Sequence, residues 1–266
     1  EVISTDNLHV SLGWMDIFAH FNDPGKEYRE DLISGTNAAR TGGFTDVMVG
    51  PNTDPAISSR TQVEYFIQRS ASLPVSVHPI ACVTRNHAGK ELAEMYDLKD
   101  SGAVAFSDGL HPIQDAGIML KALQYILPFD GTLMQIPINK SIQPGGLMHE
   151  GIMSTKLGLP GKPAIAEEMM ISRDIDLLRY TGSRIHFSGV STEKGLQLII
   201  KAKEEGLRVT CSVTPYHCHF CDEDLNGYDS HLKTDPPLRS RSDMMAMQKA
   251  LQQGLIDGIA SHHMPL

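Results

Sequence analysis

The chain has 266 residues and a net charge of −9, and 41% of its residues are hydrophobic, 21% charged and 6% aromatic. These values exclude a disordered chain and are ordinary for a soluble α/β domain with a sizeable core. The acidic balance disfavours a nucleic-acid partner, and no apolar run approaches the roughly 18 residues that a membrane span needs. The first residues lack the basic and apolar regions of a signal peptide, so we expect a cytoplasmic protein without membrane contact.

Eight short apolar runs alternate with longer amphipathic stretches, which is the pattern of repeated βα units in a parallel sheet. Strands are predicted near 14–21, 44–50, 75–83, 103–107, 132–136, 184–188, 208–213 and 256–261. Helices are predicted near 30–42, 59–70, 90–100, 114–126, 163–181, 193–206 and 241–254. Several helices end at a glycine, such as Gly42 and Gly206, because glycine enters the left-handed C-cap conformation at low cost.

Eight strands in a chain of this length predict a (β/α)8 TIM barrel, here one domain over residues 1–266. A closed barrel has its chemistry on the loops that follow the strands. The connection 137–162 is long and rich in glycine and proline. We therefore expect it to lie over the barrel mouth, where it could act as a lid.

Three of the four cysteines, Cys211, Cys218 and Cys221, lie within eleven positions and close to His217 and His219. The Cys-x-x-Cys spacing would suit a structural zinc site. Such a site normally takes its ligands from two separated segments, and the second ligand pair is absent here. Reduced thiols near a strand end are the preferred interpretation.

The first predicted strand contains a motif, because residues 16–25 read Asp-Ile-Phe-Ala-His-Phe-Asn-Asp-Pro-Gly. This stretch resembles the first strand of the cyclic amidohydrolases, and of the dihydroorotases most closely, which ends in Asp-x-His-x-His-Phe-Arg-Asp/Glu-Pro-Gly. The two histidines of that family lie two residues apart, on one side of the strand, and bind the metal together. Here Phe18 stands at the first histidine position, His20 at the second and Asn22 at the arginine position.

Further stretches resemble dihydroorotase in order and spacing over nearly the whole chain. Residues 41–45 and 50–55 resemble the second-strand signature, in which an asparagine binds the substrate carboxylate, and that position is Asn52. An asparagine in such a turn also bonds nearby backbone, so a local role for Asn52 stays open. Residues 102–109 resemble the fourth-strand stretch with its two aspartates, of which only Asp108 remains, in an uncertain register. Residues 161–168 and 235–239 resemble the segments around strands six and seven.

The other ligand positions depart from the family. The histidine of the fifth strand is replaced by Ile136 or Gln135, and the histidine of the sixth strand by Gly189. The catalytic aspartate of the eighth strand is replaced by His262, and a substrate-binding asparagine is replaced by Asp235.

These losses bear on the chemistry that the resemblance implies. Hydrolysis of a cyclic amide needs a metal that lowers the pKa of bound water, and a catalytic zinc usually has three protein ligands. The family positions retain at most His20 and Asp108 as donors. We therefore expect no catalytic residue and no metal cofactor, and hydrogen-bonded packing for His20.

The sequence is identified as a degenerate dihydroorotase-type barrel that resembles the inactive dihydroorotase homologues. That resemblance implies a scaffold role in pyrimidine biosynthesis, with an aspartate transcarbamoylase-like partner or a homo-oligomer. It also implies a small β domain and more chain at both ends, so the barrel domain is expected to be incomplete. Two alternatives stay open: an active zinc-dependent dihydroorotase with a rearranged site, and a protein that binds a small carboxylate near Asn52.

Overall fold

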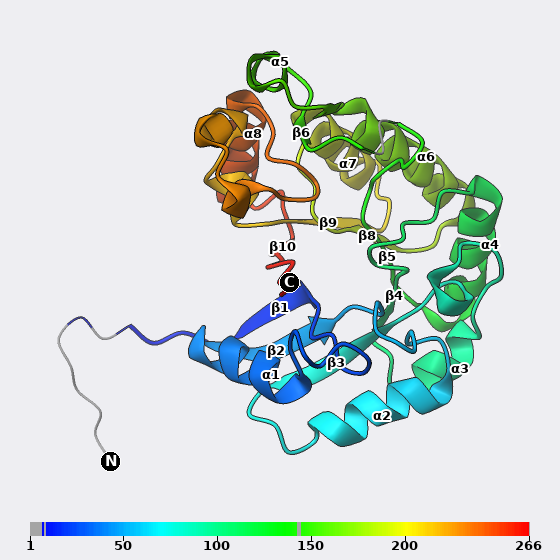
Figure 1. The fold of residues 1–266 in the computed structure, drawn as a ribbon. Coiled ribbons are helices and arrows are strands. Elements are labelled where there is room, and N and C mark those ends of the chain that lie inside the picture. The colour runs from blue at the N-terminus through cyan, green and yellow to red at the C-terminus, as the bar shows by residue number, and fades with distance from the viewer. Residues whose placement is uncertain (1–6, 8, 143–144, 266) are drawn as a thin grey trace.

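A computed structural model describes residues 7, 9–142 and 145–265 of the chain. Eight parallel strands follow one another in chain order around the sheet, in the middle of a ring of helices (Figure 1). The strands are β1 (Trp14–Ala19), β2 (Phe44–Val49), β3 (Ser76–Ala81), β4 (Ala105–Phe106), β5 (Leu133–Gln135), β8 (Ile185–Phe187), β9 (Val209–Val213) and β10 (Gly258–Ile259). All eight predicted strands are therefore present.

Backbone pairing between the first and last strands closes the sheet. Ala19 forms a parallel bridge with His263. The amide of His20 donates to the carbonyl of His263 at 2.8 Å, and the amide of His262 donates to the carbonyl of Phe18 at 3.0 Å. The predicted (β/α)8 barrel is confirmed.

Seven of the eight α-helices in the described part of the chain lie within the ranges that the sequence predicts, and the helix at Ile152–Leu157 is the exception. The helices are α1 (Leu32–Thr41), α2 (Arg60–Ser70), α3 (Met95–Asp100), α4 (Ala116–Ile126), α5 (Ile152–Leu157), α6 (Ile165–Thr181), α7 (Glu193–Glu204) and α8 (Arg241–Gln252). Side chains cap the amino ends of several of them: Asp31 accepts from the amide of Ser34, and Thr192 accepts from that of Gly195. None of the helices in the described part of the chain is long and apolar enough to cross a membrane.

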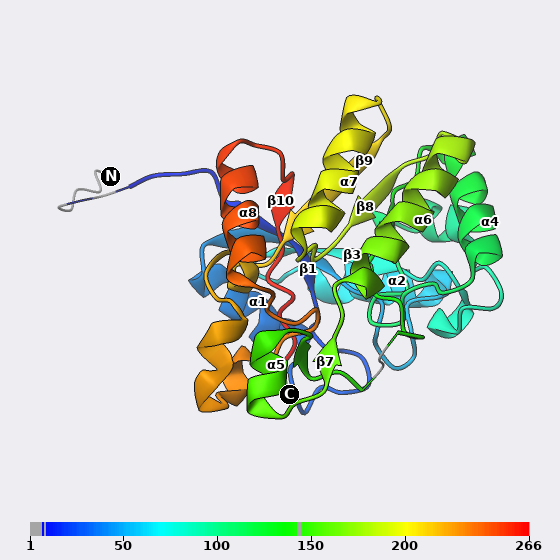
Figure 2. The ribbon, with the colours of Figure 1, turned by 90° about the horizontal axis from the view of Figure 1, so that it is seen from above.

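The connection 137–162 contains more structure than the loop that the sequence predicts. It forms α5 and a two-stranded parallel pair, β6 (Met148–His149) and β7 (Gly161–Lys162). Met148 and Leu157 pack against Leu225 of a short 3₁₀ segment, Asp222–Gly227. Figure 2 shows α5 and β7 at the end of the barrel where the described chain ends.

The apolar residues form two layers, because successive residues of a strand point to opposite faces of the sheet. One layer fills the space between the sheet and the helices and includes Val47, Phe106 and Phe187. The second layer fills the inside of the barrel. Its buried members are Phe18, Ile80, Ala105, Met134, Ile136 and Ala260. The barrel is thus a packed core, and free space begins only at its mouth.

Candidate functional site

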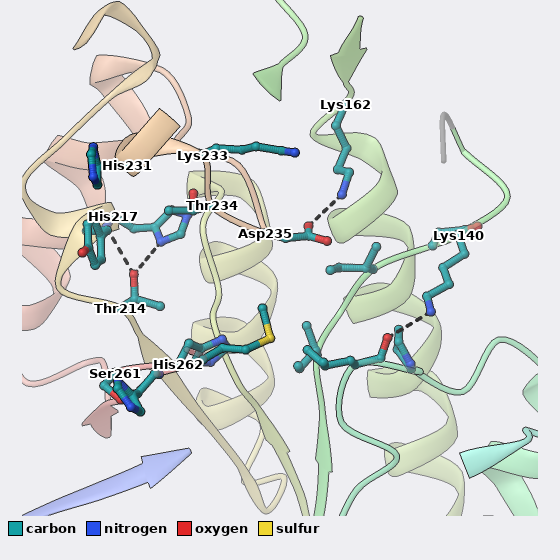
Figure 3. A pocket seen from close by; sticks show the side chains of 18 of the residues that line it. Lys140, Lys162, Thr214, His217, His231, Lys233, Thr234, Asp235, Ser261 and His262 are labelled. Atoms are coloured by element: carbon teal, nitrogen blue, oxygen red, sulfur yellow. Dashed lines mark hydrogen bonds and ion pairs between the residues drawn. The ribbon is translucent and has the colours of Figure 1, made fainter. Parts of the chain in front are cut away.

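A cavity of about 1020 Å³ opens at the carboxyl ends of the strands, where a barrel is expected to have its site (Figure 3). Its walls come from the segments that follow β4, β5, β9 and β10 and from the connection around β7. The polar lining residues are Asn139, Lys140, Lys162, Thr214, Tyr216, His217, His231, Lys233, Thr234, Asp235, Ser261, His262 and His263.

Phe18 lies below this cavity, fully buried in the middle of the barrel. Its ring centroid is 5.1 Å from that of His20 and 5.1 Å from that of His262. The benzyl group therefore packs against both imidazoles, and it has no lone pair with which to bind a cation.

Burial sets the protonation of both neighbouring histidines. Desolvation, with a smaller contribution from the charge of His263, lowers the pKa of His20 to about 4. Desolvation also lowers the pKa of His262, and the charges of His20, His217 and His186 act in the same direction. Both imidazoles are neutral near pH 7.

His262 lies beside the position where the family motif has the sixth-strand histidine. A Cβ atom on Gly189 would lie 2.8 Å from Cε1 of His262, and Gly189 has a φ of +75°. Nε2 of His262 is 2.9 Å from Oγ of Ser188. The imidazole of His262 thus occupies the space that a side chain at position 189 would need.

Asp108 is buried and its carboxylate is bonded to the loop after β3. Oδ1 accepts from the amides of Val83 and Thr84, both at 2.9 Å, and Oδ2 accepts from the hydroxyl of Thr84. Desolvation raises the pKa of Asp108 to about 6, although these bonds favour the charged form. The carboxylate therefore fixes a loop in this structure and does not line the cavity.

Asn52 lies on the loop after β2 and bonds the backbone of a different loop. Its Nδ2 donates to the carbonyl of Asp108 at 3.1 Å, and its Oδ1 accepts from the amide of Leu110 at 2.9 Å. It is absent from the residues that line the cavity. The substrate-binding role of Asn52 stays a prediction, and in this structure the amide joins two loops of the barrel mouth.

The structure resolves the register of the fifth strand. The Gln135 side chain points outward, where its Nε2 donates to the carbonyl of Ile113 at 3.2 Å and lies 3.4 Å from Oδ2 of Asp174. Ile136 belongs to the layer inside the barrel and borders the cavity. Ile136, the residue directly after β5, therefore faces the mouth.

The remaining predicted positions lie at the rim and beneath it. Asp235 forms an ion pair with Lys162, with 2.7 Å between Oδ1 and Nζ. Asn22 is buried with a φ of +56°. Its Nδ2 has no hydrogen-bond partner among the residues that the structure describes.

A buried ion pair that sequence reasoning did not identify holds the loops of this end together. Glu167, at the start of α6, accepts from the amides of Ser191 and Thr192, both at 2.9 Å. Nη2 of Arg239 is 3.4 Å from Oε2 of Glu167, and Nη1 donates to the carbonyl of Lys162. Glu167 and Arg239 each lie in a stretch that resembles the family. The motifs therefore mark both residues, but they do not indicate that the two side chains form an ion pair.

Comparison with known proteins agrees with the motifs. The family model described as dihydro-orotase-like matches residues 9–195. The chain belongs to the dihydroorotase-like family.

Curated relatives of this family match the full length of the chain. It is 41% identical over 265 residues to a dihydroorotase of Carboxydothermus hydrogenoformans and 44% identical over 265 residues to one of Pelotomaculum thermopropionicum. Each match covers 100% of this chain and 62% of the relative, so the chain spans about three fifths of their length.

Solved structures agree on the fold. L-hydantoinase from Arthrobacter aurescens superposes with a TM-score of 0.82 at 22% identity, over 94% of this chain and 57% of that chain. The inactive dihydroorotase-like domain of a Chaetomium thermophilum CAD-like multifunctional protein superposes with a TM-score of 0.64 at 18% identity. This match covers 94% of this chain and 63% of that chain.

The possible donor side chains in the described part of this member of the dihydroorotase-like family are dispersed. Within residues 7, 9–142 and 145–265, no three His, Cys, Asp or Glu side chains are grouped so that they could hold an ion. This includes the cysteine-rich segment after β9. There Nδ1 of His217 is 2.8 Å from Oγ1 of Thr214. Nε2 of His217 is 3.2 Å from the carbonyl oxygens of Pro236 and Pro237. Both ring nitrogens of His217 are thus in use.

Proposed function

We propose that this chain is the barrel of a dihydroorotase-like protein that has lost metal-dependent hydrolysis and serves pyrimidine biosynthesis by binding. The observation that supports this most strongly is the ring of Phe18, which packs against both His20 and His262 in the middle of the barrel. The resemblance places the metal of the family at this point. The proposal includes a cytoplasmic location.

The chemistry of amide hydrolysis explains why this substitution matters. The attacking water must lose a proton near neutral pH. A metal makes this possible because it lowers the pKa of the water that it binds from 15.7 to about 7. Phe18, Ile136 and Gly189 provide no donor atom, and they lie on three separate strands or strand ends. One lost ligand could be replaced by a shifted neighbour, whereas several losses on separate strands cannot be repaired by local relaxation.

The second candidate is an active zinc-dependent dihydroorotase that hydrolyses dihydroorotate to carbamoyl aspartate. The names of the curated relatives, at 41% and 44% identity, support this candidate more directly than the first. It requires a rearranged site in which His20 and other donors come together, because the donors are dispersed in this structure.

Metal content and turnover distinguish the two candidates. The chain is purified without chelator, its zinc is measured by elemental analysis, and hydrolysis of dihydroorotate is followed with and without added zinc. The first candidate predicts substoichiometric zinc and no turnover under either condition. One equivalent of zinc together with turnover that a chelator abolishes would establish the enzyme. The dihydroorotase of C. hydrogenoformans, assayed in parallel, is the positive control.

The scaffold version of the proposal makes a separate statement about partners. It expects an aspartate transcarbamoylase-like subunit or a second copy of this chain to bind. Size-exclusion chromatography with light scattering, of the chain alone and mixed with a transcarbamoylase, measures both. A monomer that elutes unchanged from the mixture would remove the scaffold role and leave ligand binding.

A further inference from the structure

The charge of the cavity at the barrel mouth is opposite to that of the whole chain. The chain has a net charge of −9, but the described residues that line the cavity include the three lysines Lys140, Lys162 and Lys233 and only one carboxylate, that of Asp235. Two other acidic groups near this end are each held by a histidine. Glu30 lies 2.8 Å from Nε2 of His263, and Asp229 lies 2.8 Å from Nδ1 of His231. The cavity therefore has an excess of positive charge.

The three lysines come from separate segments and enter the same space. Lys162 is the last residue of β7, and its side chain is only 13% exposed, with Nζ paired to Asp235. Lys140 lies in the connection after β5, and its Nζ donates one hydrogen bond to the carbonyl of Leu110 at 3.0 Å. Figure 3 shows Lys233 extending across the cavity toward Lys162 and Asp235. The ammonium groups of Lys140 and Lys162 each donate one hydrogen bond within the protein. Each has three N–H donors, so further N–H groups of both lysines remain for a ligand.

We propose that Lys140, Lys162 and Lys233 bind the phosphate group of a small metabolite. This rests on the proposed function, in which the mouth binds a ligand without a metal. Three ammonium groups against one carboxylate favour an oxyanion with two negative charges. Lysine acts as a compact point charge that suits a tetrahedral phosphate, whereas planar carboxylates are typically bound by the fork of an arginine, and no arginine is among the residues that line this cavity.

The size of the cavity supports a ligand that is larger than a free anion. Ligand pockets usually have about 300–1,000 Å³, and this one has about 1020 Å³. Apolar side chains, among them Ile136, Ile138 and Met264, form part of its wall. A phosphate monoester could place its charged group at the lysines and its organic part against this apolar wall.

The test uses inorganic phosphate as the probe and isothermal titration calorimetry at pH 7.5 and low salt. We expect Lys233→Ala to raise the Kd for phosphate about tenfold, which is the usual loss for one charge-assisted hydrogen bond. Asp235→Asn should lower the Kd several-fold, because it removes the one carboxylate that competes for Lys162. Lys121→Ala, at an exposed lysine on α4 outside the cavity, is the matched control and should leave the Kd unchanged.

Succinate provides the dicarboxylate arm of the experiment. Tighter binding of phosphate than of succinate, weakened by added salt, supports the proposal. Tighter binding of succinate, an equal effect of Lys121→Ala, or no phosphate binding at millimolar concentration would overturn it. Circular dichroism of each variant verifies that it is folded.

Titrations of chelator-treated and zinc-supplemented protein separate this inference from the proposed function. Phosphate binding that requires zinc would contradict both, because it would indicate a metal site at the mouth. Absence of phosphate binding from protein that also lacks zinc and turnover would overturn the lysine site alone. Phosphate binding that is equal in both preparations supports the lysine site.

Discussion

Buried histidines make the stability of this barrel depend on pH below about 6.5, the ordinary pKa of a histidine. His186 lies inside the barrel, with Nδ1 2.8 Å from Oγ1 of Thr210 and Nε2 3.0 Å from Oγ of Ser212. Desolvation lowers its pKa to about 4 from 6.5. The charge of Asp257 has a smaller effect that raises the pKa, and the charge of Lys203 has a smaller effect that lowers it. Below pH 6.5 the unfolded chain therefore binds a proton that the folded chain excludes.

We predict that His186→Gln reduces the loss of stability between pH 6.5 and pH 4. In the wild type, this histidine lowers the free energy of unfolding by about 1.4 kcal/mol for each pH unit in that window as the pH falls, and it has no effect on the slope above it. Glutamine can still bond a hydroxyl but does not titrate. Urea unfolding at several pH values measures the two slopes.

The difference in the free energy of unfolding between the wild type and His186→Gln isolates the effect of His186 from groups that act in the opposite direction. Burial raises the pKa of Asp108 and of Asp174 to about 6, so both carboxyls stabilise the folded state as the pH falls through the same window. They are present in both proteins and cancel in the difference. Exposed His219→Gln is the control. Parallel slopes for wild type and His186→Gln would contradict the prediction.

At the scale of elements, one carboxylate fastens the first strand to the last. Asp16, on β1, is buried, and its Oδ1 accepts from the amides of Ser261 at 3.0 Å and Phe18 at 3.2 Å. Its Oδ2 accepts from the hydroxyl of Ser261. The pairing of β1 with the segment after β10 is short, so these bonds contribute much of the polar contact that closes the barrel.

We predict that Asp16→Ala lowers the free energy of unfolding by about 2–4 kcal/mol, because it leaves one buried donor, the amide of Phe18, and two partly buried donors of Ser261 without their acceptor. Asp46→Ala, on the neighbouring strand β2, is the control. Asp46 bonds His78 at 2.8 Å, but its side chain is 37% exposed, so its loss should cost less than about 1 kcal/mol. Chemical denaturation measures both. Equal losses would show that Asp16 has no special role in closure.

The elements themselves could be predicted from the sequence because their signals are local. Apolar runs and glycine stops give all eight strands and the order of the main helices. The contents of the connection 137–162 could not be predicted in this way. The strands β6 and β7 have two residues each, and α5 packs against Leu225, which is far away in the sequence. The contact of Asp16 with Ser261 spans 245 positions and has no local signature.

At the scale of the whole molecule, the family fold is present with different side chains at its site. Motif spacing alone predicts Phe18, Gly189 and His262 as altered positions, and this stays a prediction. It could not predict that His262, with a φ of +49°, places its ring beside Gly189, because that requires the closed barrel. Nor could it predict that Asp108 bonds the loop after β3. Both are contacts between segments that follow different strands, and only the fold brings these segments together.

If the fold is intact and only donors are missing, restoring the family residues should restore metal binding. We predict that the variant Phe18→His, Ile136→His, Gly189→His and His262→Asp binds about one equivalent of zinc, where the wild type binds much less. Without metal it should be less stable than the wild type by several kcal/mol, because it replaces buried apolar groups by polar ones. Zinc should raise its Tm, since a ligand that binds only the folded state stabilises it. Elemental analysis and thermal unfolding with and without zinc measure both effects.

Position 189 provides the internal control for this design. Gly189→His alone should be more destabilising than the pair Gly189→His and His262→Asp, because a Cβ at 189 lies 2.8 Å from the ring of His262 and the aspartate removes that ring. The strain of a histidine at a φ of +75°, about 1–2 kcal/mol, is common to both variants and cancels between them. Strict additivity of the two substitutions would mean that the ring of His262 does not occupy this space. A four-residue variant that folds without binding zinc would mean that the donors are misplaced by the barrel and not merely absent from it.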